Sequence, residues 1–118
     1  MSNYIIDTSL DNIERISKVD EIVTLPSDLL NPYRLIILSS LSRTEILSFQ
    51  NLKTLTKINS DGNLASHLRT LEKDGLISVH KTFAGRYPKT FYELTNEGKK
   101  RFQELLNILE NYVAAGKK

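Results

Sequence analysis

The sequence contains no cysteine, so disulfide bonds, thiolate zinc sites and thiol redox switches are all excluded. A protein without disulfides suits the cytoplasm, which is the location we expect. Long apolar runs are also absent: residues 35–38 form one of the longest, whereas a bilayer span needs roughly 20 residues. Because the N-terminus lacks a basic segment followed by an apolar one, we predict neither a signal peptide nor a membrane segment.

Patterns typical of catalysis or metal binding are equally scarce. The two histidines, His67 and His80, lie on different predicted elements, with no carboxylates nearby at the spacing of metal ligands. The sequence has no phosphate-binding glycine loop, nucleophile elbow or metalloprotease histidine pair. Glu97 lies in the first turn of a predicted helix, where the helix dipole explains its presence without catalysis. We therefore predict a protein that is not an enzyme and uses no metal or cofactor.

The length of 118 residues suits one compact domain, and the distribution of charge along it is uneven. Residues 1–30 contain two basic and six acidic side chains, whereas residues 43–90 contain eight basic and four acidic ones. A basic middle segment favours contact with a polyanion such as DNA. Chance variation in surface charge explains the same asymmetry equally well, so the charge pattern alone decides nothing.

Apolar residues recur at helical spacing in five segments. The predicted helices cover residues 9–23, 32–41, 49–56, 62–73 and 96–113. Their expected N-caps are Ser9, Asn31, Ser48, either Ser60 or Asp61, and Thr95. The apolar residues expected to face the core are Leu35, Ile36, Leu38 and Leu41 in the second helix, Phe49, Leu52 and Leu55 in the third, and Leu64, Leu68 and Leu71 in the fourth. Gly75 is expected to end the fourth helix in a left-handed conformation.

The period changes from helical to alternating after the fourth helix. Ile77, Val79 and Lys81 alternate with Ser78 and His80, which predicts a strand. Residues 82–89 predict a hairpin tip longer than a tight turn, and residues 90–94 predict the returning strand, with Tyr92 and Leu94 pointing inward. A further short extended piece is expected at residues 44–47. Two short helices, a turn and a following strand pair predict a winged helix-turn-helix domain within a mostly helical α+β fold.

Three stretches of the sequence resemble winged-helix regulators of the MarR/ArsR type from bacteria and archaea. They are residues 48–52, residues 61–77 (DGNLASHLRTLEKDGLI) and residues 91–98 (FYELTNEG), within a similarity that covers about residues 32–112. The resemblance implies a dimeric transcription factor whose recognition helix enters the major groove, while its wing lies on the backbone or in the minor groove. Such regulators often bind small-molecule effectors near the dimer interface, but nothing in this sequence specifies one.

The fourth helix supplies the first set of candidate DNA-binding residues. Asn63 suits an adenine edge, Arg69 suits guanine, and the helix N-terminus at Gly62 suits a phosphate. Asp61 would repel phosphate unless its carboxylate serves as a cap. The complete set is Asp61, Gly62, Asn63, Ser66, His67, Arg69, Thr70 and Lys73. The alternative is that these residues form the solvated face of an amphipathic helix, but the predicted helix-turn-helix context favours DNA contact.

The predicted wing supplies the second set, which consists of Lys81, Arg86, Tyr87 and Lys89 around Gly85. Cationic side chains on a hairpin suit phosphates or a narrow minor groove, and Arg86 is the strongest candidate for insertion. For Tyr87 two roles stay open. It contacts DNA by stacking or by bonding a phosphate, or it packs against the base of the wing.

The last helix carries a candidate dimer interface. Phe102, Leu105, Leu109 and Tyr112 are spaced by three, four and three residues, as in a coiled-coil seam. This spacing predicts a homodimer, the commonest symmetric assembly; the alternative is a monomer in which the N-terminal helix folds back on the C-terminal one. We therefore assign residues 1–30 to an N-terminal helix and linker, 31–95 to the DNA-binding domain and 96–118 to a dimerisation helix and tail.

The function that these observations predict is sequence-specific binding of double-stranded DNA by a transcriptional regulator. One alternative is an architectural protein that coats DNA without sequence preference, since the candidate residues also bind phosphate. The other is a winged helix used for protein contact, which would expose an apolar patch on the recognition helix. The operator, the regulated genes and the direction of regulation do not follow from the sequence.

Overall fold

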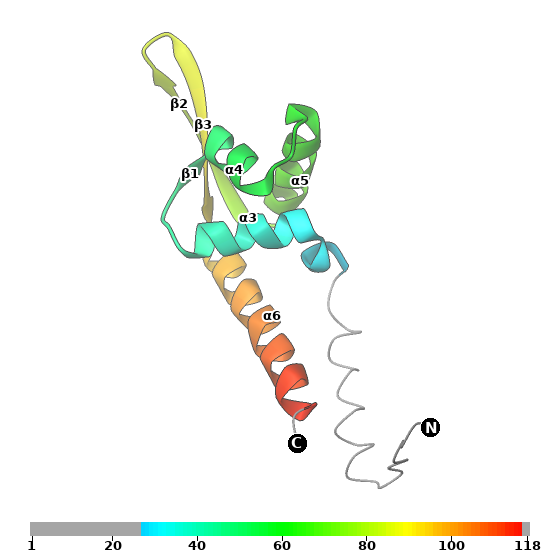
Figure 1. Ribbon diagram of the computed structural model, residues 1–118. Helices are drawn as coiled ribbons and strands as arrows, with labels where there is room; N and C mark the ends of the chain where they lie inside the picture. The colour runs from blue at the N-terminus through cyan, green and yellow to red at the C-terminus, as the bar shows by residue number, and fades with distance from the viewer. Residues whose placement is uncertain (1–26, 117–118) are drawn as a thin grey trace, which may run out of the picture. The chain divides into compact units, whose positions relative to one another are not determined.

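The computed structural model describes residues 27–116, and the predicted N-terminal helix over residues 9–23 lies outside them. Residues 27–104 belong to one compact unit, and residues 105–116 belong to another. The elements in chain order are η1 (Ser27–Leu30), α3 (Pro32–Ser42), β1 (Leu47–Ser48), α4 (Phe49–Thr56), α5 (Asp61–Lys73), β2 (Ile77–Ala84), β3 (Tyr87–Leu94) and α6 (Asn96–Ala115) (Figure 1).

The fold is the predicted α+β winged helix-turn-helix. The helix-turn-helix consists of α4 and α5, and the wing is the antiparallel hairpin of β2 and β3. A three-stranded sheet with the order β1-β3-β2 joins the wing to the helices. Figure 1 shows the outer part of the hairpin projecting away from the helices of the domain. The outer part of the wing is therefore accessible from the solvent.

Polar caps begin the helices where the sequence predicts them. The Asn31 side chain accepts a hydrogen bond from the Tyr33 N–H at 3.0 Å, with Pro32 in the first turn of α3. Ser48 and Asn51 form a reciprocal capping box at the start of α4. Of the two candidate caps of α5, Ser60 is the cap, and the helix consequently begins at Asp61. Each cap satisfies backbone N–H groups that the helix itself leaves unpaired.

The core lies where α3, α4, α5 and the sheet meet. Leu64, Leu68 and Leu71 are all buried, which confirms the predicted inner face of α5. Two other predictions of buried residues were wrong. Ile36 is 37% exposed while its neighbour Ile37 is buried, and Leu55 is 46% exposed while Thr56 is buried.

The physical reason for the second error is a hydrogen bond that makes a polar side chain suitable for the core. The Thr56 hydroxyl donates to the Leu52 carbonyl oxygen at 2.8 Å, so its burial leaves no donor without a partner. In α3 the error is one of phase. The buried face centres on Ile37, Leu38 and Leu41, so Ile36 lies about 100° away from Ile37 and reaches solvent.

The sheet differs from the prediction in two places. The short strand lies at Leu47–Ser48 rather than at residues 44–47, because Leu47 and Ser48 are the residues that pair with Tyr92 and Phe91. The hairpin tip is shorter than predicted, since pairing continues to Ala84 and Tyr87 and leaves only Gly85 and Arg86 in the turn. Gly85 has a φ of 67°, the sign that the first residue of a type II′ turn requires.

A junction around Thr95 connects the end of α5, the start of the wing and the start of α6. The Thr95 hydroxyl donates to the Gly75 carbonyl oxygen at 2.6 Å and accepts from the Gly98 N–H at 2.9 Å. The Thr95 N–H donates to the Leu76 carbonyl oxygen at 3.1 Å. The close approach depends on a glycine, because a Cβ on Gly98 would overlap the Leu76 carbonyl oxygen and lie 3.1 Å from a Leu94 methyl carbon.

We therefore expect Gly98→Ala to destabilise the protein by about 2 kcal/mol or more, since the added methyl group meets backbone that has little freedom to move. Gly62→Ala is the matched control: it is also a helical glycine, and the nearest atom to its added Cβ is the Ser60 hydroxyl oxygen at 3.8 Å. This control should gain about 0.5 kcal/mol from helix propensity. Urea denaturation followed by circular dichroism measures both values, and equal midpoints for the two variants would contradict the packing described.

Candidate DNA-binding surface

The outward face of α5 is polar along its length. Asn63, Ser66 and Lys73 are exposed and Thr70 is half-exposed, all on the side opposite the buried leucines. The Thr70 hydroxyl donates to the Ser66 carbonyl oxygen at 3.1 Å, which leaves its lone pairs available as acceptors. The structure thus brings four of the predicted residues onto one face with both donor and acceptor groups.

The N-terminus of α5 leaves room for a bound anion. Asp61 is not the cap, and its carboxylate instead lies 2.6 Å from the Lys53 ammonium of α4. The negative charge that would oppose a phosphate therefore has a cationic partner beside it. Gly62 follows with no side chain and with free space around it, so a bulky anion can approach the first N–H groups of the helix.

His67 lies at the edge of the buried face, beside α3 rather than in the middle of the exposed face. The Arg34 guanidinium donates from Nε to His67 Nδ1 at 3.2 Å, and the Tyr33 ring centroid is 5.6 Å from that of His67. Because arginine only donates, Nδ1 is unprotonated and the proton of the neutral ring is on Nε2. Burial, and secondly the charge of Arg34, lower the pKa of His67 and thereby favour its neutral form.

A cleft of about 380 Å³ lies between α5 and the wing. Arg69 and Glu72 of α5 line one side, and Lys81, Thr90 and Tyr92 of the wing line the other. Burial raises the pKa of the Tyr92 hydroxyl, and the charge of Glu72 adds to the rise. Arg69 and Lys81, predicted separately for the helix and the wing, therefore face a common cleft.

The wing exposes every side chain predicted to contact DNA. Lys81, Arg86 and Lys89 are all exposed. Tyr87 is 77% exposed beside the turn, so the alternative role of packing the base of the wing is wrong. Sequence reasoning missed Phe83, which is 73% exposed. The signal was present, because alternation from Ile77 and Val79 through Lys81 places Phe83 on the same face of the strand.

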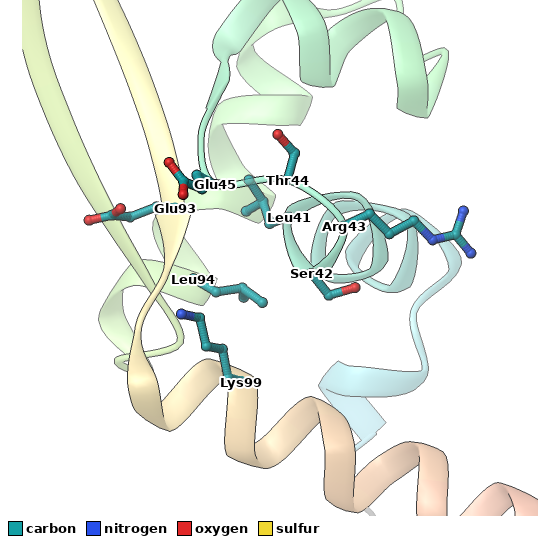
Figure 2. A pocket seen from close by; sticks show the side chains of 8 residues that line it. All are labelled: Leu41, Ser42, Arg43, Thr44, Glu45, Glu93, Leu94 and Lys99. Carbon is teal, nitrogen blue, oxygen red and sulfur yellow. The ribbon is translucent and has the colours of Figure 1, made fainter.

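A second cavity, of about 460 Å³, lies at the base of the wing (Figure 2). Its lining residues are Leu41, Ser42, Arg43, Thr44, Glu45, Glu93, Leu94 and Lys99. The pKa of Glu93 is lowered, mainly because its carboxylate accepts a hydrogen bond from His80, whose Nε2 lies 2.8 Å away. Figure 2 shows Arg43 pointing away from Glu93 and Lys99. With dispersed charges of both signs, this cavity favours no single class of ligand.

The four residues of the predicted dimer seam divide into two pairs. Phe102 and Leu105 are buried within the single chain, with Leu105 only 1% exposed. Leu109 is half-buried and Tyr112 is exposed. Leu106 and Val113 are further exposed apolar residues of α6. The side chains that a second subunit could reach are therefore those in the last turns of the helix.

Over residues 27–116, no cluster of three or more histidine or acidic side chains is arranged to hold a metal ion. Within the same range, none of the helices has the length and hydrophobicity needed to cross a membrane.

Comparison with known families decides what kind of domain this is. Residues 33–113 match the family model described as a winged helix DNA-binding domain. The chain belongs to this winged helix DNA-binding family. An uncharacterized protein of Methanocaldococcus jannaschii is 35% identical to this chain over 83 residues, and the match covers 66% of this chain and 88% of that protein.

Solved structures agree with the family. The transcriptional regulator homologue from Pyrococcus horikoshii OT3 is 31% identical to the winged-helix protein, with a TM-score of 0.74 over 83% of this chain and 95% of that chain. A MarR family transcriptional regulator from Silicibacter pomeroyi is 26% identical, with a TM-score of 0.62 over 89% of this chain and 68% of that chain. The chain thus belongs to a family of DNA-binding transcriptional regulators rather than of enzymes, and a MarR family regulator is among its solved relatives.

The lowered pKa of His67 makes the stability of the winged-helix protein depend on pH. The unfolded chain binds a proton at this position more readily than the folded chain does, so the contribution is present above the ordinary histidine pKa of about 6.5 and is lost as the pH falls. His67→Gln keeps a carbonyl acceptor for Arg34 but does not titrate. Between neutral and mildly acidic pH, the urea midpoint should therefore fall less in this variant than in the wild type. An equal fall in both proteins would argue against His67 as the source of the pH dependence.

Proposed function

We propose that the winged-helix protein is a sequence-specific regulator that places α5 in the major groove of double-stranded DNA and its wing on the backbone or in the minor groove. The polar outward face of α5 supports this proposal most directly. Asn63 and Arg69 belong to the side-chain types that form paired hydrogen bonds with adenine and guanine edges. Since this face exposes no large apolar side chain, it suits hydrated base edges better than an apolar protein partner.

The charge around α5 supports the same docking. Lys73 lies at the end of the helix, and Lys81, Arg86 and Lys89 lie on the adjacent wing, all of them exposed. Contacts between such cations and phosphates orient a protein on the duplex but carry no sequence information of their own. We propose that α5 provides the sequence specificity and that the wing orients the protein on the DNA. His67, at the flank of α5, contributes a single hydrogen-bond donor, its Nε2–H.

Fluorescence anisotropy tests the proposal with two duplexes at two salt concentrations, one being the DNA upstream of the protein's own gene and the other its scrambled version. Specific sites bind typically about 10³-fold or more tightly than non-specific DNA. Tight binding to the upstream duplex alone supports a local regulator. Equal binding to both duplexes supports an architectural protein, and failure to bind either one supports a protein-contact module.

Two variants separate base contact from phosphate contact. Asn63→Ala should lose about tenfold or more of the discrimination between the duplexes, because a paired contact to one base edge disappears. Arg86→Ala should weaken binding to both duplexes by a similar factor and reduce the salt dependence. Asn111→Ala, an exposed asparagine on α6, is the control and should leave both affinities unchanged. Unchanged affinity in Arg86→Ala would remove the wing from the interface.

We also propose that the protein is a homodimer joined through the last turns of α6. Leu106, Tyr112 and Val113 are exposed there at 36%, 41% and 55%, respectively. Exposed apolar side chains gathered on one helix are typical of a subunit interface. A two-fold dimer would present two copies of α5 to successive turns of the DNA, which suits a nearly palindromic operator.

Val113→Glu should convert the dimer to a monomer, since a carboxylate at a covered apolar position loses its hydration without gaining a partner. Asn111→Glu adds the same charge at a neighbouring exposed position and should stay dimeric. Light scattering coupled to size exclusion gives both masses. Phe102 and Leu105 are unsuitable for this test because their burial in the chain itself would confuse dissociation with unfolding. A dimeric mass for Val113→Glu would move the interface elsewhere.

A further inference from the structure

The outer end of the wing carries the two most exposed of the large hydrophobic side chains between residues 27 and 116. Phe83 is 73% exposed and Tyr87 is 77% exposed. Lys81 and Thr90 form the outermost cross-strand pair that lines the cleft against α5. Beyond that pair the hairpin continues for several residues without covering its aromatic side chains, so the core of the domain does not explain why they are aromatic.

The register places apolar groups on both faces of this tip. Phe83 pairs across the hairpin with Pro88, and Ala84 pairs with Tyr87. Directly paired residues share a face, and successive pairs alternate between faces. Phe83 and Pro88 therefore cover the face that continues toward α5, while Tyr87 covers the opposite face. Gly85 and Arg86 form the apex between these two surfaces.

The charges around these aromatic residues indicate what kind of partner fits. Residues 81–90 contain three basic side chains and no acidic one. A tip that enters a nucleic-acid groove meets phosphates on both sides, so exclusively positive neighbours complement it, whereas a protein surface matches such a tip only where that surface is strongly acidic. The charge complementarity therefore favours DNA as the occupant.

The size of the tip has a consequence for that DNA. A minor groove of B-DNA is about 6 Å wide, whereas a β-ribbon with side chains on both faces is about 10 Å thick, the spacing at which sheets pack face to face. A hairpin with aromatic groups on both faces does not fit an undeformed minor groove. Proteins that solve this problem insert apolar side chains such as phenylalanine or proline between base pairs, which opens the groove and kinks the duplex.

We propose that Phe83, supported by Pro88, is an apolar wedge that opens the minor groove, partly unstacks one base step and bends the DNA. The inference rests on the proposed function and adds to it a deformation of the operator. Specificity then arises also where the wing lies, because pyrimidine–purine steps such as TA unstack more easily than stiff A-tracts. Arg86 at the apex and the flanking lysines neutralise the phosphates that the bend brings together.

The experiment uses the full chain and the upstream duplex, first footprinted and then labelled with a donor dye and an acceptor dye at its two ends. A second copy of the duplex carries 2-aminopurine, whose fluorescence rises on unstacking, within the footprint. Wild-type protein should raise both energy transfer and 2-aminopurine fluorescence at saturation. Phe83→Ala should bind with an affinity within about tenfold of wild type and lose both signals, because the wedge contact and the unstacking cost disappear together.

Two variants serve as matched controls. Phe83→Leu keeps an apolar wedge and should retain most of the bend. Ile46→Ala removes an exposed apolar side chain outside the wing and should behave as wild type. The side chain of Phe83 is largely in solvent, so circular dichroism of Phe83→Ala should match that of the wild type.

The outcomes are distinguishable. Tight binding of a straight, stacked duplex by the wild type overturns the wedge but leaves the proposed function intact, as does an equal bend with Phe83→Ala. Absence of binding to every duplex overturns the proposed function and the wedge together. A change in oligomeric mass on Phe83→Ala with the duplex shape unaltered would assign the tip to contacts between protein chains and would also overturn the wedge.

Discussion

The approach of the first turn of α6 to the backbone of Leu76 is the constraint on which the rest of the domain depends. Gly98 makes that approach sterically feasible, and Thr95 uses one hydroxyl to connect the Gly75 carbonyl oxygen with the Gly98 N–H. Three parts of the chain converge there, namely the end of α5, the residues that lead into β2 and the start of α6. The direction in which the wing leaves the domain is consequently tied to the direction of α5.

The leucine face of α5 determines which side chains of this helix reach the surface. Leu64, Leu68 and Leu71 are buried, so the polar residues between them have to face outward. Hydrogen bonds then refine what each side chain offers. Thr70 becomes chiefly an acceptor because it donates to Ser66, and His67 becomes a donor through Nε2 because Arg34 occupies Nδ1. The pattern of donors and acceptors that α5 presents thus depends on intramolecular partners as well as on residue type.

Features that arise from local interactions were predictable from the sequence. The caps at Asn31 and Ser48 and the leucine spacing of α5 involve residues at most a few positions apart, so their geometry follows from helical period. Features that depend on distant partners were not. The bond from Arg34 to His67 spans 33 residues, and strand register decides both the position of β1 and the length of the hairpin turn. For the same reason, the spacing on α6 did not reveal that Phe102 and Leu105 are already covered within the chain.

The length of the hairpin has a consequence for the thermodynamics of recognition. Beyond Lys81 and Thr90, the outermost pair that lines the cleft, β2 and β3 continue as a paired ribbon that closes at the Gly85 turn. An isolated two-stranded ribbon is marginally stable in water. Its amides should exchange with solvent much faster than those of the leucine-packed helix. Any complex in which a ligand contacts the outer part of the hairpin has to reduce the conformational entropy of that part of the hairpin. Changes at the turn can therefore tune affinity through the free protein alone, without altering a single contact in the complex.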